Sequence, residues 1–308
     1  MSDMKLYIDG VDVYNDVHVT HLSYEMHAEK QADCLTMRFT DTKGLWSKWN
    51  PQEGTQIRWK YENADSGQMF VHEAKPENGL YTIKALSIPL SARTKRSKSW
   101  EGVRFKQLAQ EIATNNGLSA QFYGVSDQVY PVMFQKDESD MAFLSRLCTY
   151  ECCQFIVYNK TLVVYSEAYM ESQSADEEIE IKEDGKFTYN NNRTRMYGSC
   201  EVKSGSYSGS FSDPSPATSS VYRPEGVRVS NNAEAARFAK GLLRDQNKYG
   251  WTGQVSKKLK TEYAACSVMK LKTPKAETWN GKVFVYRAIH DYMANKTTLY
   301  FRGLVEGY

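Results

Sequence analysis

Alternating apolar and polar residues dominate the first third of the chain. In residues 34–40, Leu35, Met37 and Phe39 are separated by polar residues, and residues 80–90 repeat this pattern. Asp9 followed by Gly10, between two short apolar runs, is typical of a hairpin turn. The pattern therefore predicts six or so short strands within residues 1–92, an arrangement typical of a β-barrel or a β-sandwich.

The hydrophobic period changes after a basic cluster at residues 93–98. Phe105, Leu108, Ala109 and Ile112 recur at the spacing of one face of an amphipathic helix, and Gly117 follows them. Glycine just beyond a periodic run is a common helix stop. We therefore predict a helix that ends before residue 117.

A second helix is expected to begin in the polar run 137–140. The side-chain oxygens of Glu138, Ser139 and Asp140 suit the free amides and the positive end of a helix, and we expect Asp140 to act as a cap. Its apolar face is formed by Met141, Leu144, Leu147 and Cys148. Residues 155–158 and 161–165 then predict a hairpin, which completes a small α+β unit.

The remainder of the chain returns to β structure after two loop-like stretches. Residues 171–185 are strongly acidic and residues 203–220 are rich in Ser, Gly and Pro, so both are expected to be connections. Asn231 or Asn232 can cap a third helix, whose apolar side contains Ala235, Phe238 and Leu242. Strands are predicted at 251–256, 266–272, 282–289 and 297–304.

These elements predict an α+β, β-rich fold in four parts. Residues 1–95 form a first β-rich domain, a barrel or a sandwich, and residues 96–170 form an α+β domain of two helices and a hairpin. Residues 171–230 form a connection with one strand. Residues 231–308 form a second β-rich domain with one helix, and its first strand is expected near 186–203.

Charge is unevenly distributed along the 308 residues, although the formal net charge is only +2. Carboxylates outnumber basic residues in residues 1–185, and basic residues outnumber carboxylates in residues 186–308. Such asymmetry is typical either of nucleic-acid binding or of a complementary interface with an acidic neighbour, including a second copy. The scattered basic residues favour the interface. The sequence also contains no apolar run of about 20 residues and begins with no secretory signal, so we expect no membrane insertion.

Residues with catalytic or metal-binding chemistry are not arranged in a recognisable pattern. The six cysteines are expected to be reduced, and the five histidines have no metal-ligand spacing. Glycine-rich phosphate loops are absent from the sequence. Glu138 and Asp140 could form a paired acid and base of a peptidoglycan-cleaving enzyme, but helix capping explains them without any catalysis, and no positional signal supports the catalytic pair. We therefore predict no catalytic residue, no cofactor and no metal.

Several runs together resemble the late control protein D family of phage tails. Residues 97–100 read Ser-Lys-Ser-Trp, the helix of residues 105–118 follows the family's "IA…GL" pattern, and residues 135–147 follow "Q…ESD..FL.RL". A weaker block extends to about residue 303. The chain departs from the family where Cys152 and Cys153 replace a common glycine. The matching positions are Trp100, Leu108, Ile112, Gly117, Gln135, Glu138, Ser139, Asp140, Phe143, Leu144 and His290.

The resemblance implies a structural role without catalysis. Members of this family are hub proteins of contractile tails, of phage-tail-like bacteriocins and of type VI secretion spikes. The resemblance implies that residues 1–95 and 231–308 each form a tail-tube-like β-barrel domain. It also implies a homotrimer whose six barrel-like domains join the sixfold tail tube to the threefold central spike, beside other baseplate proteins. It also implies assembly in the bacterial cytoplasm, followed by incorporation into a released tail or tail-like particle.

Two other functions remain open from the sequence. One is a tail-associated peptidoglycan hydrolase, which would use a carboxylate pair. The other is nucleic-acid binding by the basic C-terminal part, although no sequence-specific reading element is recognisable.

Overall fold

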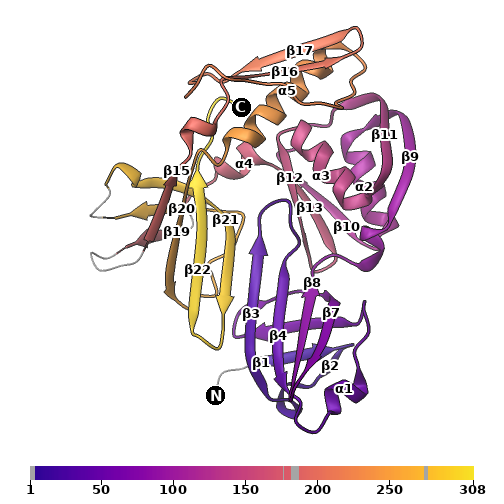
Figure 1. Cartoon of the computed structure of the whole chain (residues 1–308), viewed down its shortest axis with the longest axis vertical. Helices are drawn as coiled ribbons and strands as arrows, with labels where there is room; N and C mark the ends of the chain where they lie inside the picture. Colours follow the sequence, from indigo (N-terminus) through magenta and orange to yellow (C-terminus); the bar gives the residue numbers. More distant parts are fainter. Residues whose placement is uncertain (1–3, 176, 182–186, 274–276) are drawn as a thin grey trace.

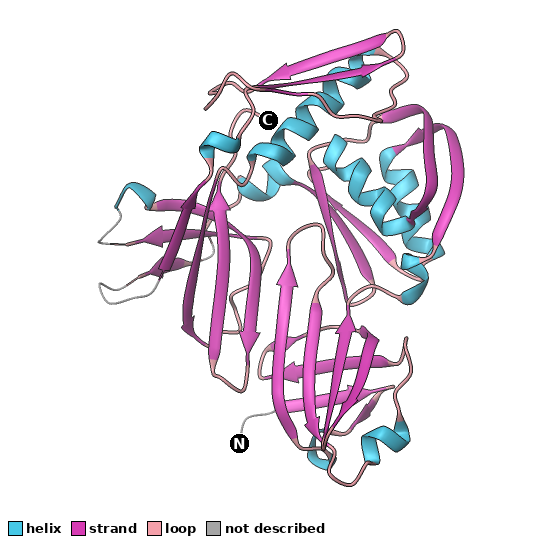
Figure 2. Ribbon diagram, in the orientation of Figure 1, coloured by secondary structure: helices cyan, strands magenta, loops and turns pink. Residues whose placement is uncertain are grey.

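A computed structural model describes residues 4–175, 177–181, 187–273 and 277–308. Strands of the N-terminal and C-terminal parts lie beside each other, and the middle part and its helices lie above and to one side (Figures 1 and 2). The N-terminal part contains η1 (Tyr14–Asp16), α1 (Leu45–Trp49), η2 (Leu90–Arg93) and the strands β1 (Met4–Ile8), β2 (Val11–Asp12), β3 (Val19–His27), β4 (Cys34–Thr40), β5 (Gln56–Tyr61), β6 (Ala64–Asp65), β7 (Met69–Glu77) and β8 (Leu80–Leu86).

The C-terminal part supplies the other strands of the same sheet. They are β14 (Glu178–Glu180), β15 (Phe187–Asn191), β19 (Trp251–Lys258), β20 (Ser267–Lys272), β21 (Gly281–Asp291) and β22 (Lys296–Gly303), accompanied by η3 (Arg193–Arg195) and η4 (Glu277–Trp279). The main strand order is β15-β19-β22-β21-β3-β4-β8-β7-β5-β1-β2, in a sheet of 14 strands. β20 pairs with β21 and β14, and β6 pairs with β5.

The first and last parts of the chain are joined by the antiparallel pairing of β3 with β21. The register runs from Arg287 opposite His27 to Asp291 opposite Ser23. None of the described sheets closes into a barrel, so the arrangement of two barrels is not confirmed. Alternating strands predicted the β content correctly, but pairing between strands so distant in sequence leaves no local signal.

Each half of this sheet nevertheless packs around its own apolar core. In the N-terminal half, Leu6 and Trp59 from β1 and β5 share a cluster with Leu35 and Ile83 from β4 and β8. A separate cluster in the C-terminal half contains residues of β19, β20, β21 and β22. The sheet therefore folds over on itself in the N-terminal half, because strands far apart in its order bury side chains together.

The middle part contains β9 (Lys95–Arg104), α2 (Phe105–Asn115), β10 (Ser119–Tyr123), β11 (Val129–Ser139), α3 (Asp140–Tyr150), β12 (Cys153–Tyr158), β13 (Thr161–Ser166) and α4 (Glu167–Glu171). Both predicted helices and the predicted hairpin are present. The basic run after residue 93 was not predicted to be a strand, yet it begins β9, which pairs antiparallel with β11 as a two-stranded ribbon. Only Trp100 and Val103 of β9 are buried, so its hydrophobic alternation is weak.

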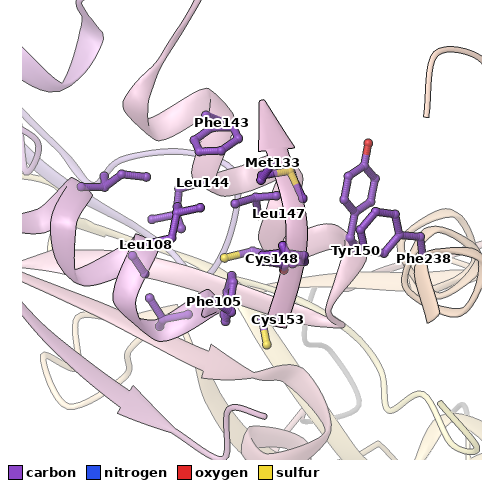
Figure 3. Close-up of a cluster of buried hydrophobic side chains, with 14 of the residues drawn as sticks. Phe105, Leu108, Met133, Phe143, Leu144, Leu147, Cys148, Tyr150, Cys153 and Phe238 are labelled. Atoms are coloured by element: carbon purple, nitrogen blue, oxygen red, sulfur yellow. The ribbon is translucent and has the colours of Figure 1, made fainter. Parts of the chain in front are cut away.

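The apolar faces of α2 and α3 meet in one core that extends to α5 (Asn232–Asn247). Figure 3 shows Phe105, Leu108, Leu144 and Leu147 gathered in this core. The rings of Tyr150 and Phe238 are stacked with centroids 4.2 Å apart, and this contact connects α3 to α5.

The Ser/Gly-rich stretch predicted as a connection contains ordered strands. β16 (Ser199–Ser204), β17 (Tyr207–Ser212) and β18 (Val221–Tyr222) form a small sheet on α5. Gly209 explains part of the composition, because a Cβ there would lie 2.2 Å from the backbone nitrogen of Ala236 in α5. Small residues in this hairpin therefore allow a close strand–helix approach, which is a packing role rather than a linker role. The division of the chain into these four parts stays a prediction.

Candidate functional site

A buried cluster of charged side chains connects the parts of the chain, and we call it the ionic junction. It contains Glu29 beyond β3, Glu167 and Glu171 of α4, Arg244 of α5, Lys248 just after α5, and Arg302 of β22. All six are at most 6% exposed. Three cations and three carboxylates thus balance each other away from water.

The ion pairs of the junction are short and shared. Arg244 donates from Nε to Glu167 at 2.8 Å and from Nη2 to Glu171 at 2.6 Å. Arg302 reaches Glu171 Oε1 with Nη1 at 2.8 Å. Lys248 is paired with Glu167 at 3.0 Å and also with Glu29. Each of these three cations contacts two or more carboxylates.

Neighbouring charges in the junction favour the charged forms of Glu167 and Lys248. Burial by itself would raise the pKa of Glu167, but the charges of Lys248, Arg244 and Arg302 outweigh it and lower this pKa to about 2. Burial would lower the pKa of Lys248, whereas Glu167 and Glu29 raise it above its usual value. Glu167 and Lys248 therefore stay charged. The ion pairs of the junction hold α4, α5, β22 and the β3–β4 turn together.

The Glu-Ser-Asp motif lies at the start of α3 and is wholly engaged in structural contacts. The helix cap is Ser139, whose Oγ accepts a hydrogen bond from the amide of Ala142 at 3.3 Å. The expectation that Asp140 caps the helix is wrong. Its buried carboxylate instead accepts hydrogen bonds from Asn116 Nδ2 at 2.8 Å and Gln135 Nε2 at 3.0 Å, and so connects α2, β11 and α3.

Glu138 does not share a site with Asp140. Glu138 instead forms an ion pair with Nη2 of Arg146 in α3, at 2.5 Å. Because both carboxylates already have partners, the motif has the chemistry of a fold determinant and not of an acid and base pair.

The other motif residues lie in or beside the same core. Trp100 stacks on Phe143 with centroids 5.2 Å apart and donates to Glu111 Oε2 at 3.0 Å. Leu108, Ile112 and Leu144 are buried. Gly117 follows α2 with a φ of 67°, a left-handed conformation that suits glycine.

His290 is the motif residue that the structure places elsewhere, in β21 of the large sheet. It is buried, and its Nδ1 lies 2.9 Å from Thr297 Oγ1. Burial lowers its pKa from 6.5 to about 4, so the imidazole is neutral at physiological pH. The resemblance places His290 in its second, weaker block together with Thr297, and these two side chains are in contact in the structure.

The described residues hold no group of three or more His, Cys, Asp or Glu side chains arranged for a metal ion. The six cysteines are free thiols, and Cys148 and Cys153 belong to the apolar core. Among the described helices, none has the length and apolar character needed to cross a membrane. Sequence reasoning missed the ionic junction, because its partners are scattered between residues 29 and 302 and carry no motif.

The sequence matches no protein-family model and no curated protein. Its fold, however, is shared with phage tail proteins along almost the whole chain. The 43 kDa tail protein of prophage MuSo2 from Shewanella oneidensis has a TM-score of 0.75 and 9% identity, with 98% of each chain covered. A tail protein from Neisseria meningitidis MC58 has a TM-score of 0.75 and 12% identity, covering 97% of this chain and 96% of that one.

A third similar structure comes from a secretion system. It is an Escherichia coli component of the type VI secretion system that is structurally similar to the bacteriophage T4 tail proteins gp27 and gp5. The TM-score is 0.59 at 12% identity, and the match covers 99% of this chain and 78% of the other. At identities this low the similarity establishes the fold, which is the architecture of these tail and secretion proteins.

Proposed function

We propose that this chain is a structural hub of the baseplate of a contractile injection particle, either a phage tail or a tail-like device. The observation that carries the proposal is the shared fold with a phage tail protein over 98% of both chains.

The finer proposal is a homotrimer that joins the sixfold tail tube to the threefold central spike and contacts other baseplate proteins. Its support is the division of the large sheet into two halves with separate cores, one from each end of the chain. If each half imitates one tube subunit, three copies present six such units, as the resemblance to late control protein D proteins implies. The ionic junction would then fix the angle between the halves.

The proposed role is not enzymatic. Glu138 and Asp140, the carboxylates that a peptidoglycan hydrolase would use, are held by Arg146 and by Asn116 and Gln135. Zymography on bacterial cell wall tests this point, and we expect no cleared band. The proposed location is the tail of a released particle, after assembly in the bacterial cytoplasm.

Electron microscopy of the purified chain tests the hub directly. We expect class averages of a threefold ring with a central channel. Monomers, dimers or an open fibre over a range of protein concentrations would contradict the proposal, since only a closed ring can match both symmetries.

A further inference from the structure

A groove of about 860 Å³ lies between the β9–β11 ribbon, α3 and residues 226–230, which lead into α5. This volume is within the range of about 300–1,000 Å³ that is typical of ligand sites. We call it the cationic groove. Gln135 of the family motif lines this groove. The proposed hub function does not by itself assign a role to the groove.

The charged residues that line the groove are all basic. Lys98, Lys136, Arg146 and Arg228 line it, and its lining residues include no carboxylate. Lys98 and Arg146 already form ion pairs, with Glu111 and Glu138 respectively.

The other two cations differ from these. Across the described residues, no ion pair engages Lys136 or Arg228. Two positive charges are therefore available to a ligand.

Apolar surface lies beside these charges on β11. Phe134 is 45% exposed and Val132 is 36% exposed. The guanidinium of Arg228 lies 5.8 Å from the centre of the Phe134 ring, so the cation and the ring form adjacent parts of one surface. A ligand that satisfies the groove needs anionic and apolar groups in close succession.

Backbone of β11 also faces the groove. Five consecutive residues, 132–136, line it, and Arg146 Nη2 donates to the carbonyl of Phe134 at 2.9 Å. β11 pairs with β9 alone in the described part of the chain, so its second edge has no strand partner. A free strand edge accepts an extended peptide, whose side chains then occupy neighbouring pockets.

We propose that the cationic groove binds an acidic, extended segment of a partner protein. Carboxylates of the segment pair with Lys136 and Arg228, and an aliphatic or aromatic side chain packs on Phe134 and Val132. Two available cations and an apolar floor favour a peptide over a nucleic acid, which would need more phosphate contacts. The proposal goes beyond the hub function and does not depend on the trimer.

Fluorescence anisotropy with the full chain tests the proposal. The probe is a short fluorescein-labelled peptide in which glutamate and leucine alternate. We expect saturable binding that weakens about tenfold or more in the double variant Lys136→Glu/Arg228→Glu, because charge reversal removes both ion pairs. A peptide with lysine in place of glutamate should not bind.

The matched control is Lys258→Glu/Lys296→Glu, two exposed lysines paired across β19 and β22 in the large sheet. It should bind the acidic peptide like the unchanged chain. Phe134→Ser should weaken binding without a change of charge, and an unchanged circular dichroism spectrum verifies that each variant is folded.

Four results would overturn the proposal. They are a dissociation constant weaker than about 1 mM for the acidic peptide, equal losses in the groove and control variants, unchanged binding by the groove variant, and tighter binding of a single-stranded oligonucleotide than of the peptide. None of these bears on whether the chain forms a threefold ring, so failure here and failure of the hub proposal are distinguishable.

Discussion

The ionic junction and the cationic groove are both rich in Lys and Arg, but they differ in burial and in pairing. Lys248 is fully buried and contacts Glu29, Glu167 and Asp245. Lys136 lines an open groove and has no ion-pair partner among the described residues. The paired, buried charges connect distant segments of this fold, whereas the unpaired charges of the groove are accessible to a ligand.

The difference also changes how the charge asymmetry of the sequence is interpreted. Glu29, Glu167 and Glu171 come from the acidic part of the chain, and Arg244 and Arg302 come from the basic part. Some of the charge that suggested an interface with a neighbouring molecule is therefore neutralised within one chain.

The largest expected effect is the loss of one cation from the junction. Arg302→Met should lower the free energy of unfolding by about 3–5 kcal/mol, because it leaves Glu171 and Glu167 buried with fewer counter-charges. Urea denaturation measures the change.

Arg223→Met is the matched control for that substitution. Arg223 pairs with Glu201 at 2.9 Å on the surface, and its loss should cost no more than about 1 kcal/mol. Equal costs for the two substitutions would contradict a stabilising junction.

The next-largest expected effect is the pH dependence of stability contributed by His290, whose pKa is lowered by burial. The pKa of His290 falls from 6.5 to about 4 on folding, so the unfolded chain binds its proton first as the pH falls. Its contribution to stability is constant above about pH 6.5 and is lost as the pH decreases toward 4, by up to about 3 kcal/mol.

Urea denaturation of the unchanged chain and of His290→Gln between pH 7 and pH 4 measures this contribution. As the pH falls, the free energy of unfolding of the unchanged chain should decrease more than that of the variant. Parallel curves over this range would show that His290 does not titrate as its burial implies.

A smaller effect separates two neighbouring residues of the Glu-Ser-Asp motif. Asp140→Ala should cost about 2–3 kcal/mol, because it removes a buried carboxylate that accepts hydrogen bonds from both Asn116 and Gln135. Ser139→Ala removes only the helix cap and should cost about 1 kcal/mol. Thermal or urea unfolding of both variants checks the order, and a larger cost at Ser139 than at Asp140 would contradict the connecting role of the Asp140 carboxylate.

The elements that the sequence predicts well are those whose information is local. Phe105, Leu108 and Ile112 identify α2 by their spacing, and alternating residues identify β4 and β8. The β9–β11 ribbon escaped prediction because β9 is mostly charged and exposed.

Long-range features could not be predicted from any one segment. The pairing of β3 with β21 and the ion pair of Glu29 with Lys248, 219 residues apart, depend on the completed fold. The cationic groove has the same origin, since Lys136 and Arg228 approach it from different elements.

Native mass spectrometry of the chain, produced together with the tube and spike proteins of its own particle, tests the hub most directly. If the chain is the hub, we expect a complex that contains three copies of this 35.2 kDa chain and binds both partners. A single copy that binds neither the tube protein nor the spike protein would contradict it.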